Sequence, residues 1–171
     1  MTKVAKYVLT VDVEKCDGCR QCEMICSLVH TDGLISPAKA RVNVMKKETM
    51  GVDIPMVCRH CEEPPCADVC PMNAIIRDEE TGAVLIVEDK CIGCRECILA
   101  CPFGAIKFDI ERSKPIKCDL CIDRVKAGEL PACVEWCQWG KIRYERADLM
   151  EREKRQKAME KLARSQIESL S

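Results

Sequence analysis

Sixteen cysteines in four groups of four constrain this 171-residue chain more than any other feature of its sequence. The first and third groups share the spacing C-x2-C-x2-C-x3-C, the second opens its middle gap to four residues, and the fourth opens it to eleven. No cysteine is left over, so we expect four sites of one kind. The groups are Cys16, Cys19, Cys22 and Cys26; Cys58, Cys61, Cys66 and Cys70; Cys91, Cys94, Cys97 and Cys101; and Cys118, Cys121, Cys133 and Cys137.

The repeated spacing is typical of cysteines that bind cubane 4Fe–4S clusters through their thiolates. Three cysteines on a short loop can bind three corners of one cube, and the fourth, beyond a helical turn, can reach a neighbouring cluster. Sixteen cysteines at four thiolates for each cluster predict four 4Fe–4S clusters. Gly18 and Gly93, each inside a C-x-G-C segment, suit the close backbone approach that such a loop requires.

Two further repeats support this grouping. In three groups a Gly or Asn follows the last cysteine by three places, where positive φ can end a short helix, and an Ile comes two places later. These pairs are Asn73 with Ile75, Gly104 with Ile106, and Gly140 with Ile142. A lysine precedes the first cysteine of three groups, as Lys15, Lys90 and Lys117. Internal repetition of this kind indicates duplicated units.

Zinc and disulfide bonds are the competing uses of these thiols. The fourth group alone fits a zinc site made of two cysteine pairs, but zinc does not account for a C-x2-C-x2-C run. Residues 1–6 carry no apolar export signal, and disulfides do not persist in a reducing cytosol. We therefore expect iron–sulfur clusters in a cytoplasmic protein, with a zinc-stabilised interaction module as the remote alternative.

Motifs for catalysis are absent from the sequence. There is no C-x3-C-x2-C radical motif, and no glycine-rich loop for a nucleotide or flavin. His30 and His60 are alternative metal ligands, but the cysteine count is already complete; we expect His60 and Arg59 to tune the potential of the second cluster instead. A net charge of −1 argues against a nucleic-acid partner, and no apolar run approaches the roughly 20 residues of a membrane span.

Short strands separate the cysteine groups, and a helix ends the chain. Alternating apolar residues on either side of turn residues predict a hairpin between the second and third groups. The lack of Gly, Pro and Cys from Glu145 to Ser171 favours a helix, with Glu151/Arg155 and Glu153/Lys157 as i,i+4 ion pairs. The predicted strands are Tyr7–Val13, Arg41–Met45, Ala74–Arg77, Ala83–Val87, Ala105–Ile110 and Lys141–Tyr144.

Three segments carry a resemblance to a known family. Cys58–Cys66 reads C-R-H-C-E-E-P-P-C, Cys91–Cys97 reads C-I-G-C-R-E-C, and Lys117–Cys121 reads K-C-D-L-C. With these motifs, residues 5–145 resemble the four-cluster ferredoxin-like electron-transfer subunits of multi-component oxidoreductases. The resemblance implies an α+β fold of tandem bacterial-type two-cluster ferredoxin units, in which short β-hairpins and short helices surround the clusters, followed by the C-terminal helix.

The same resemblance implies an exchange of ligands between groups. The four implied ligand sets are Cys58, Cys61, Cys66 and Cys101; Cys91, Cys94, Cys97 and Cys70; Cys16, Cys19, Cys22 and Cys137; and Cys118, Cys121, Cys133 and Cys26. The first two sets form an inner unit at residues 58–108, and the last two form an outer unit at residues 1–57 and 109–145. Residues 146–171 are a helical extension. Only the second and third groups end in Cys-Pro, so the outer pairing follows the family pattern less closely.

For function, the resemblance implies a subunit that conducts electrons and is not catalytic alone. The expected partner is a catalytic oxidoreductase subunit with a tungsten or molybdenum cofactor, preferably a tungsten-class aldehyde oxidoreductase. A hydrogenase or a carbon-monoxide dehydrogenase is the alternative, and so is a free polyferredoxin. The second redox partner is expected to be a ferredoxin, a flavoprotein subunit or another copy of this chain. The short length, without a membrane tail, favours a cytoplasmic complex.

Overall fold

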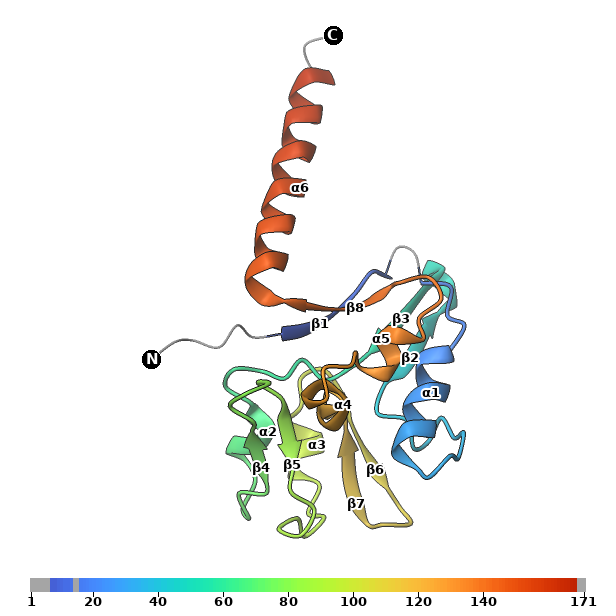
Figure 1. Ribbon diagram of the computed structural model, residues 1–171, viewed down its shortest axis with the longest axis vertical. Coiled ribbons are helices and arrows are strands. Elements are labelled where there is room, and N and C mark those ends of the chain that lie inside the picture. The colour runs from blue at the N-terminus through green and yellow to red at the C-terminus, as the bar shows by residue number, and fades with distance from the viewer. Residues whose placement is uncertain (1–6, 14–15, 169–171) are drawn as a thin grey trace.

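A computed structural model describes residues 7–13 and 16–168 (Figure 1). The strands are β1 (Tyr7–Val11), β2 (Asn43–Lys47), β3 (Val52–Met56), β4 (Ile75–Arg77), β5 (Val84–Ile86), β6 (Ile106–Asp109), β7 (Lys114–Lys117) and β8 (Ile142–Arg146). The helices are α1 (Gln21–His30), α2 (Pro65–Asp68), α3 (Glu96–Ala100), α4 (Ile122–Lys126), α5 (Ala132–Glu135) and α6 (Ala147–Glu168), with a short 3-10 helix, η2, at Glu48–Met50.

Every sheet in the described part of the chain has two antiparallel strands. β2–β3, β4–β5 and β6–β7 are hairpins, whereas β1 pairs with β8 from the other end of the sequence. Tyr7 lies opposite Arg146 and Val11 opposite Ile142, and the rings of Tyr7 and Tyr144 stack with centroids 4.9 Å apart. The fold is α+β with short hairpins, as the sequence predicts.

Two strands, β3 and β7, are absent from the sequence predictions, and each contains a proline. Pro55 lies opposite Val44, and Pro115 lies opposite Phe108. Proline lacks the N–H that a central strand must donate, so it is confined to edge strands. In a two-stranded sheet both strands are edges, and this is why Pro55 and Pro115 are tolerated. The strand predicted at Arg41–Met45 lies two residues later, at Asn43–Lys47.

Buried side chains form two separate cores. One core draws on both ends of the chain and on the segment before the second cysteine group; it includes Leu9, Val42, Val44, Val57, Leu120 and Ile142. The other lies around the β4–β5 hairpin and includes Ile75, Val84 and Ile106. Cysteines contribute to both cores. The sequence has only two each of Phe, Tyr and Trp, so we expect groups held by thiols to fill space that large side chains would otherwise fill.

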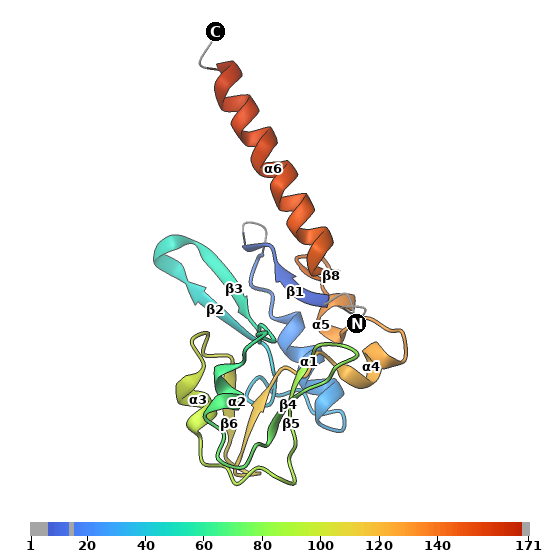
Figure 2. The same cartoon turned by 90° about the vertical axis from the view of Figure 1, so that its left-hand side faces the viewer.

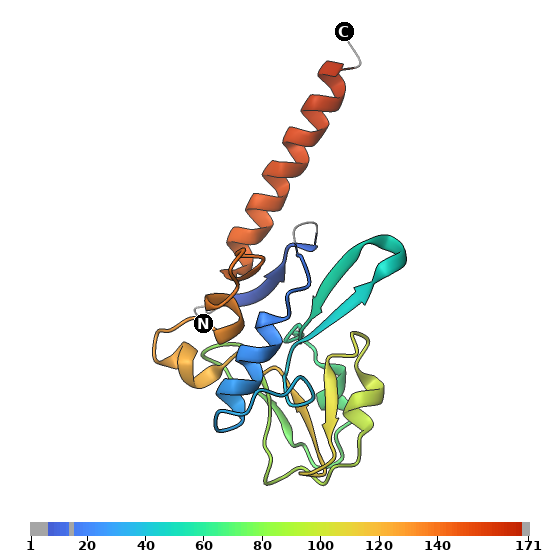
Figure 3. The ribbon, with the colours of Figure 1, turned by 90° about the vertical axis from the view of Figure 1, so that its right-hand side faces the viewer.

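The helix α6 and the β2–β3 hairpin project from the body of the molecule (Figures 2 and 3). α6 follows β8 directly and carries the predicted ion pairs: Glu153 lies 2.6 Å from Lys157, and Glu151 lies 3.9 Å from Arg155. Its apolar residues Met159 and Leu162 are exposed. Leu170 and Ser171 of the predicted helix lie outside the described residues. Among the described residues, no helix combines the length and the apolar character that crossing a bilayer requires.

Candidate iron–sulfur sites

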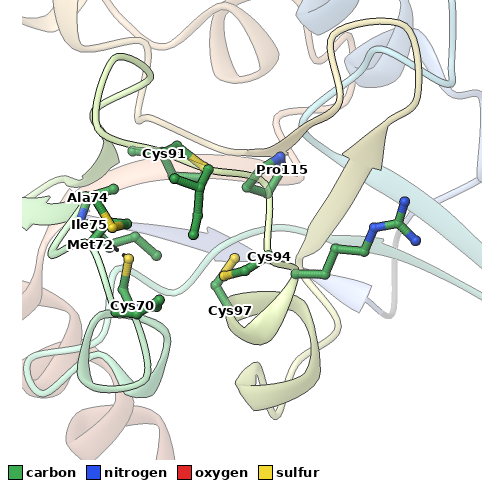
Figure 4. Close-up of a pocket in the computed structure, with 12 residues that line it drawn as sticks. Cys70, Met72, Ala74, Ile75, Cys91, Cys94, Cys97 and Pro115 are labelled. Atoms are coloured by element: carbon green, nitrogen blue, oxygen red, sulfur yellow. Dashed lines mark hydrogen bonds between the residues drawn. The ribbon is translucent and has the colours of Figure 1, made fainter.

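One cavity is lined by four cysteines from two different groups. Cys91, Cys94 and Cys97 come from the loop before α3 and its first turn, and Cys70 comes from the end of the second group. Figure 4 shows their side chains around one space, with Ile75 and Pro115 completing its wall. We call this set of four cysteines the Cys91 site.

A second cavity repeats this arrangement with the groups reversed. Cys58, Cys61 and Cys66 line it together with Cys101, the last cysteine of the third group. The remaining wall is mainly apolar and includes Val84, Phe103 and Ile106. We call these four cysteines the Cys58 site.

Cys26 of α1 lies among three cysteines of the fourth group. Burial raises the pKa of the Cys133 thiol well above its usual value, and the negative charges of Cys118, Cys121 and Cys26 add to this rise. Burial also raises the pKa of Cys118, with Cys26 again among the charges that contribute. Charges affect a pKa strongly only at close range, so Cys26 lies near Cys118 and Cys133, and Cys22 of the first group also lies within range of Cys133. We call Cys118, Cys121, Cys133 and Cys26 the Cys118 site.

The last four cysteines gather around the start of α1. Burial raises the pKa of Cys22 to about 12, and the charges of Cys19 and Cys16 contribute to the rise. Burial likewise raises the pKa of Cys19, with Cys137 among the smaller contributors. We call Cys16, Cys19, Cys22 and Cys137 the Cys16 site. Among all sixteen cysteines, only Cys19 here and Cys94 of the Cys91 site are exposed.

A left-handed residue shapes the loop at the start of each group. The residue two places after the first cysteine has positive φ in all four groups, with values of 66° for Gly18, 47° for His60, 73° for Gly93 and 65° for Leu120. In three groups its N–H points back to the sulfur of that first cysteine. The N···Sγ distances are 3.5 Å for His60 to Cys58, 3.4 Å for Gly93 to Cys91 and 3.4 Å for Leu120 to Cys118.

The turns after the last cysteines follow the predicted repeat. Asn73, Gly104 and Gly140 have φ of 48°, 57° and 57°, which confirms the left-handed position three places after the last cysteine. Each turn presents the following N–H to the cysteine sulfur. The N···Sγ distances are 3.3 Å for Ala74 to Cys70, 3.5 Å for Ala105 to Cys101 and 3.2 Å for Lys141 to Cys137.

Cys26 departs from this pattern because α1 continues past it to His30. Its sulfur accepts instead from the backbone N–H of Arg41 at 3.2 Å, and it lies 3.8 Å from His30 Nδ1. His30 Nε2 lies 3.1 Å from Asp119 Oδ1, and Arg41 binds the other carboxylate oxygen of Asp119. The sequence indicates His30 only as an alternative ligand and gives no sign of this network.

Charges within the network are strongly stabilised. Burial disfavours a charged ring at His30, but hydrogen bonds with Asp119, Cys121 and Cys26 outweigh burial and raise the pKa of His30 to about 12. Burial also opposes the charge of Asp119, but His30 and Arg41 hold the pKa of that carboxyl well below its usual value. The network therefore places the negative charge of Asp119 between the positive charges of His30 and Arg41, beside the Cys118 site.

Gly18 and Gly93 make close contacts other than those expected, and the contact at Gly93 is with the backbone. A Cβ on Gly93 would lie 2.4 Å from the carbonyl oxygen of Ser113, and a Cβ on Gly18 would lie 2.4 Å from the carboxylate of Asp53. Ser113 belongs to the β6–β7 turn and Asp53 to β3. These glycines let neighbouring hairpins pack directly against the loops of the cysteine groups.

Basic side chains lie beside the Cys91 and Cys58 sites: Arg95 lines the first cavity and Arg59 lines the second. The Arg95 guanidinium lies 3.9 Å from the ring centroid of Phe108, and Arg59 lies 5.9 Å from that of Phe103. His60 is buried, and its Nδ1 accepts the backbone N–H of Val84 at 2.9 Å. Lys117 is buried as well, and its Nζ lies 3.7 Å from Cys58 Sγ.

The donor set fits iron–sulfur clusters. Buried thiols with raised pKa values are poor free thiolates, but a metal deprotonates the thiols that coordinate it. Backbone N–H groups directed at sulfur, apolar walls and nearby positive charge are the features by which proteins tune the potentials of such clusters. The cysteines that line each of the two cavities number four, as one cubane requires.

Comparisons with known proteins agree with this chemistry. Residues 50–146 and residues 15–75 each match a family described as a 4Fe-4S dicluster domain. The polyferredoxin-like subunit of aliphatic sulfonate oxidoreductase from Pyrococcus furiosus is 40% identical over 129 residues, which cover 75% of this chain and 70% of that subunit.

Components of two bacterial reductases are also similar. One subunit of tetrathionate reductase from Salmonella typhimurium is 34% identical, and the match covers 79% of this chain and 56% of that subunit. One component of anaerobic dimethyl sulfoxide reductase from Escherichia coli is 35% identical, with 77% of this chain and 69% of that component covered. The chain therefore belongs to the 4Fe–4S dicluster family, as an iron–sulfur electron-transfer protein with four 4Fe–4S clusters that is not catalytic alone.

Proposed function

We propose that each of the four sites is the ligand set of one cluster. The Cys91 and Cys58 sites then exchange their last cysteines, Cys70 and Cys101, and the Cys16 and Cys118 sites exchange Cys137 and Cys26. The cavities and the mutual effects of the thiols on their pKa values support this assignment. It divides the chain into an inner unit at residues 58–108, an outer unit at residues 1–57 and 109–145, and the extension at residues 146–171.

Charge effects and contacts link each proposed site to the next, and these links are the observation that carries the proposed function. Cys97 of the Cys91 site is affected by the charge of Cys66 in the Cys58 site. Lys117 contacts Cys58 Sγ and the carbonyl oxygen of Cys118. Cys133 of the Cys118 site is affected by Cys22 of the Cys16 site. The series begins at exposed Cys94 and ends at exposed Cys19.

A series with two exposed ends suits conduction between two partners. One end accepts electrons from a catalytic subunit or delivers them to it, and the other end exchanges them with a second redox protein. Each cluster, when bound, takes up and releases one electron. The chain supplies the thiolates, the N–H donors that face them, and the mainly apolar walls of the two cavities. Trp136 and Trp139, both exposed beside Cys137, suit a partner surface at the Cys16 end.

The catalytic partner is, in this proposal, an oxidoreductase subunit with a tungsten or molybdenum cofactor. By analogy with the family that the motifs resemble, the first candidate is a tungsten-class aldehyde oxidoreductase. A specific observation favours a second candidate, an oxidoreductase of sulfur compounds, because the similar proteins are subunits of aliphatic sulfonate, tetrathionate and dimethyl sulfoxide enzymes. The second redox partner is a ferredoxin, a flavoprotein subunit or another copy of this chain.

Anaerobic affinity purification of the tagged chain from its native cells tests this function. We expect about sixteen irons for each chain and a co-purifying subunit that contains tungsten or molybdenum. Activity assays on the complex with an aldehyde, an alkyl sulfonate, tetrathionate and dimethyl sulfoxide separate the two candidates. A chain with full iron that purifies alone would identify a free polyferredoxin, and a co-purifying nickel enzyme would identify a hydrogenase or a carbon-monoxide dehydrogenase.

A further inference from the structure

Lys117 is a buried cation between two of the four sites. Its side chain stands at the end of β7, and the residue is 4% exposed. Its Nζ lies 3.7 Å from Cys58 Sγ and donates hydrogen bonds to the carbonyl oxygens of Val84 and, at 2.8 Å, Cys118. Val84 and Cys58 line the cavity of the Cys58 site, whereas Cys118 belongs to the Cys118 site.

Strand pairing holds Lys117 in this position. Lys117 lies directly opposite Ile106 in the β6–β7 hairpin, so both side chains are on the same face of the sheet. Ile106 lines the cavity of the Cys58 site. The hairpin therefore directs the ammonium group of Lys117 toward that cavity, while the backbone continues into Cys118.

The ammonium group has no carboxylate partner in the described part of the chain. Asp119 and Glu88 line a neighbouring cavity together with Lys117, but His30 and Arg41 bind Asp119, and Arg112 binds Glu88. A buried charge without an opposite charge is strongly unfavourable. The opposite charge available to Lys117 is that of the thiolates at the Cys58 and Cys118 sites.

We propose that the positive charge of Lys117 raises the reduction potentials of the clusters at both the Cys58 and the Cys118 sites. The inference rests on the proposed ligand sets. Reduction adds one negative charge to a cluster, and a fixed positive charge nearby in a medium of low dielectric constant favours that form. Because one ammonium group contacts residues of both sites, it lowers the cost of placing an electron on either side of the junction between the inner and outer units.

Lys90 provides a matched control. It occupies the same place in the repeat, directly before the first cysteine of its group, but its side chain is exposed. Lys90→Met therefore removes the same charge from an equivalent position in solvent. Lys117→Arg keeps the positive charge with a different shape, and Lys117→Met removes the charge while keeping much of the apolar stem.

The experiment is a potentiometric titration of the anaerobically prepared full chain, followed by electron paramagnetic resonance, with iron analysis of every variant. In Lys117→Met we expect about sixteen irons and two of the four cluster signals at lower potential. The expected shift is at least tenfold in the equilibrium constant for reduction, or about 59 mV for one electron. Lys117→Arg and Lys90→Met should keep the potentials of the unmodified chain.

Full iron with unchanged potentials in Lys117→Met would overturn the inference, as would an equal shift in Lys117→Arg. If Lys117→Met loses iron, Lys117→Arg decides the question. Full iron and unchanged potentials in Lys117→Arg would support the need for a charge, and loss of iron in both would overturn it. Far fewer than about sixteen irons in the unmodified chain would instead contradict the proposed ligand sets.

Discussion

His30 Nε2 lies 3.1 Å from Asp119 Oδ1, although 89 positions separate the two residues in the sequence. The contact ties the end of α1 to the loop that carries Cys118 and Cys121. It joins the first and fourth cysteine groups, whose last cysteines are not followed by proline. The ion pair between His30 and Asp119 thus stabilises the contact between the first and fourth groups, whose pairing follows the family pattern less closely.

Replacing His30 by Gln should accelerate the loss of iron to a chelator, because the charge opposite Asp119 is removed. The pKa of His30 is raised in the folded protein, so its contribution is fully present below its ordinary pKa of about 6.5 and declines as the pH rises toward about 12. We therefore expect a larger difference between His30→Gln and the unmodified chain at pH 6 than at pH 9. Equal differences at both pH values, or the same effect from exposed Lys47→Gln, would contradict this prediction.

Asp78 and Lys126 link the β4–β5 turn to α4, with Nζ 2.8 Å from Oδ2. The hydrogen bond from Lys126 holds the pKa of Asp78 at about 2, so this contribution is lost only as the pH falls from about 3.9 through that value. Asp78→Asn should raise the rate of iron loss roughly twofold to fivefold, equally at pH 6 and pH 9. Glu80→Gln is the control, because Glu80 is exposed and lies 3.9 Å from the same lysine. A rate of iron loss for Asp78→Asn no higher than that for Glu80→Gln would show that this ion pair does not stabilise the contact between the β4–β5 turn and α4.

Gly93→Ala should destabilise the Cys91 site by more than the cost of placing alanine at a positive φ. The added Cβ would lie 2.4 Å from the carbonyl oxygen of Ser113, so the loop or the β6–β7 turn has to move. Gly33→Ala is a matched control: Gly33 also has positive φ, but nothing lies within 4 Å of the added Cβ. Iron analysis should show a loss of at least one cluster, about four irons, only in Gly93→Ala. Equal iron in both variants would refute the importance of this contact.

Pairs of Cys→Ala substitutions should reveal which cysteines share a cluster. On the proposed assignment, Cys70→Ala with Cys94→Ala damages one cluster and leaves three intact. Cys70→Ala with Cys61→Ala damages two and leaves two intact. Integrated electron paramagnetic resonance of the fully reduced chains counts the intact clusters. The reverse order of the two counts would mean that each group keeps its own fourth cysteine.

The cofactor and the β4–β5 hairpin could be predicted because cysteine spacing and strand alternation are local properties of the sequence. The hairpin of β4 and β5 lies where alternation places it, and Asn73 and Gly104 adopt the left-handed conformation that their positions predict. The strands β3 and β7 could not be predicted in the same way. Their prolines exclude a central strand, and only the arrangement of sheets shows that each of these strands has a free edge.

Contacts between distant segments account for the remaining differences. The sequence places a lysine before three cysteine groups, but it does not show that Lys117 is buried while Lys90 is exposed. It marks Gly18 and Gly93 as special, yet their close neighbours Asp53 and Ser113 come from other segments of the chain. Spacing within a segment identifies the thiols, whereas their charged surroundings depend on how the hairpins pack.

The pairing of β1 with β8 imposes an order on biosynthesis. β1 emerges early from the ribosome, but its partner strand and Cys137 emerge only after residues 12–136. All the cysteines from Cys58 to Cys101 are available sooner, on a contiguous stretch of chain. On the proposed assignment, iron delivery to a growing chain can finish in the middle of the molecule first, and the Cys16 site becomes complete only once Cys137 has been made.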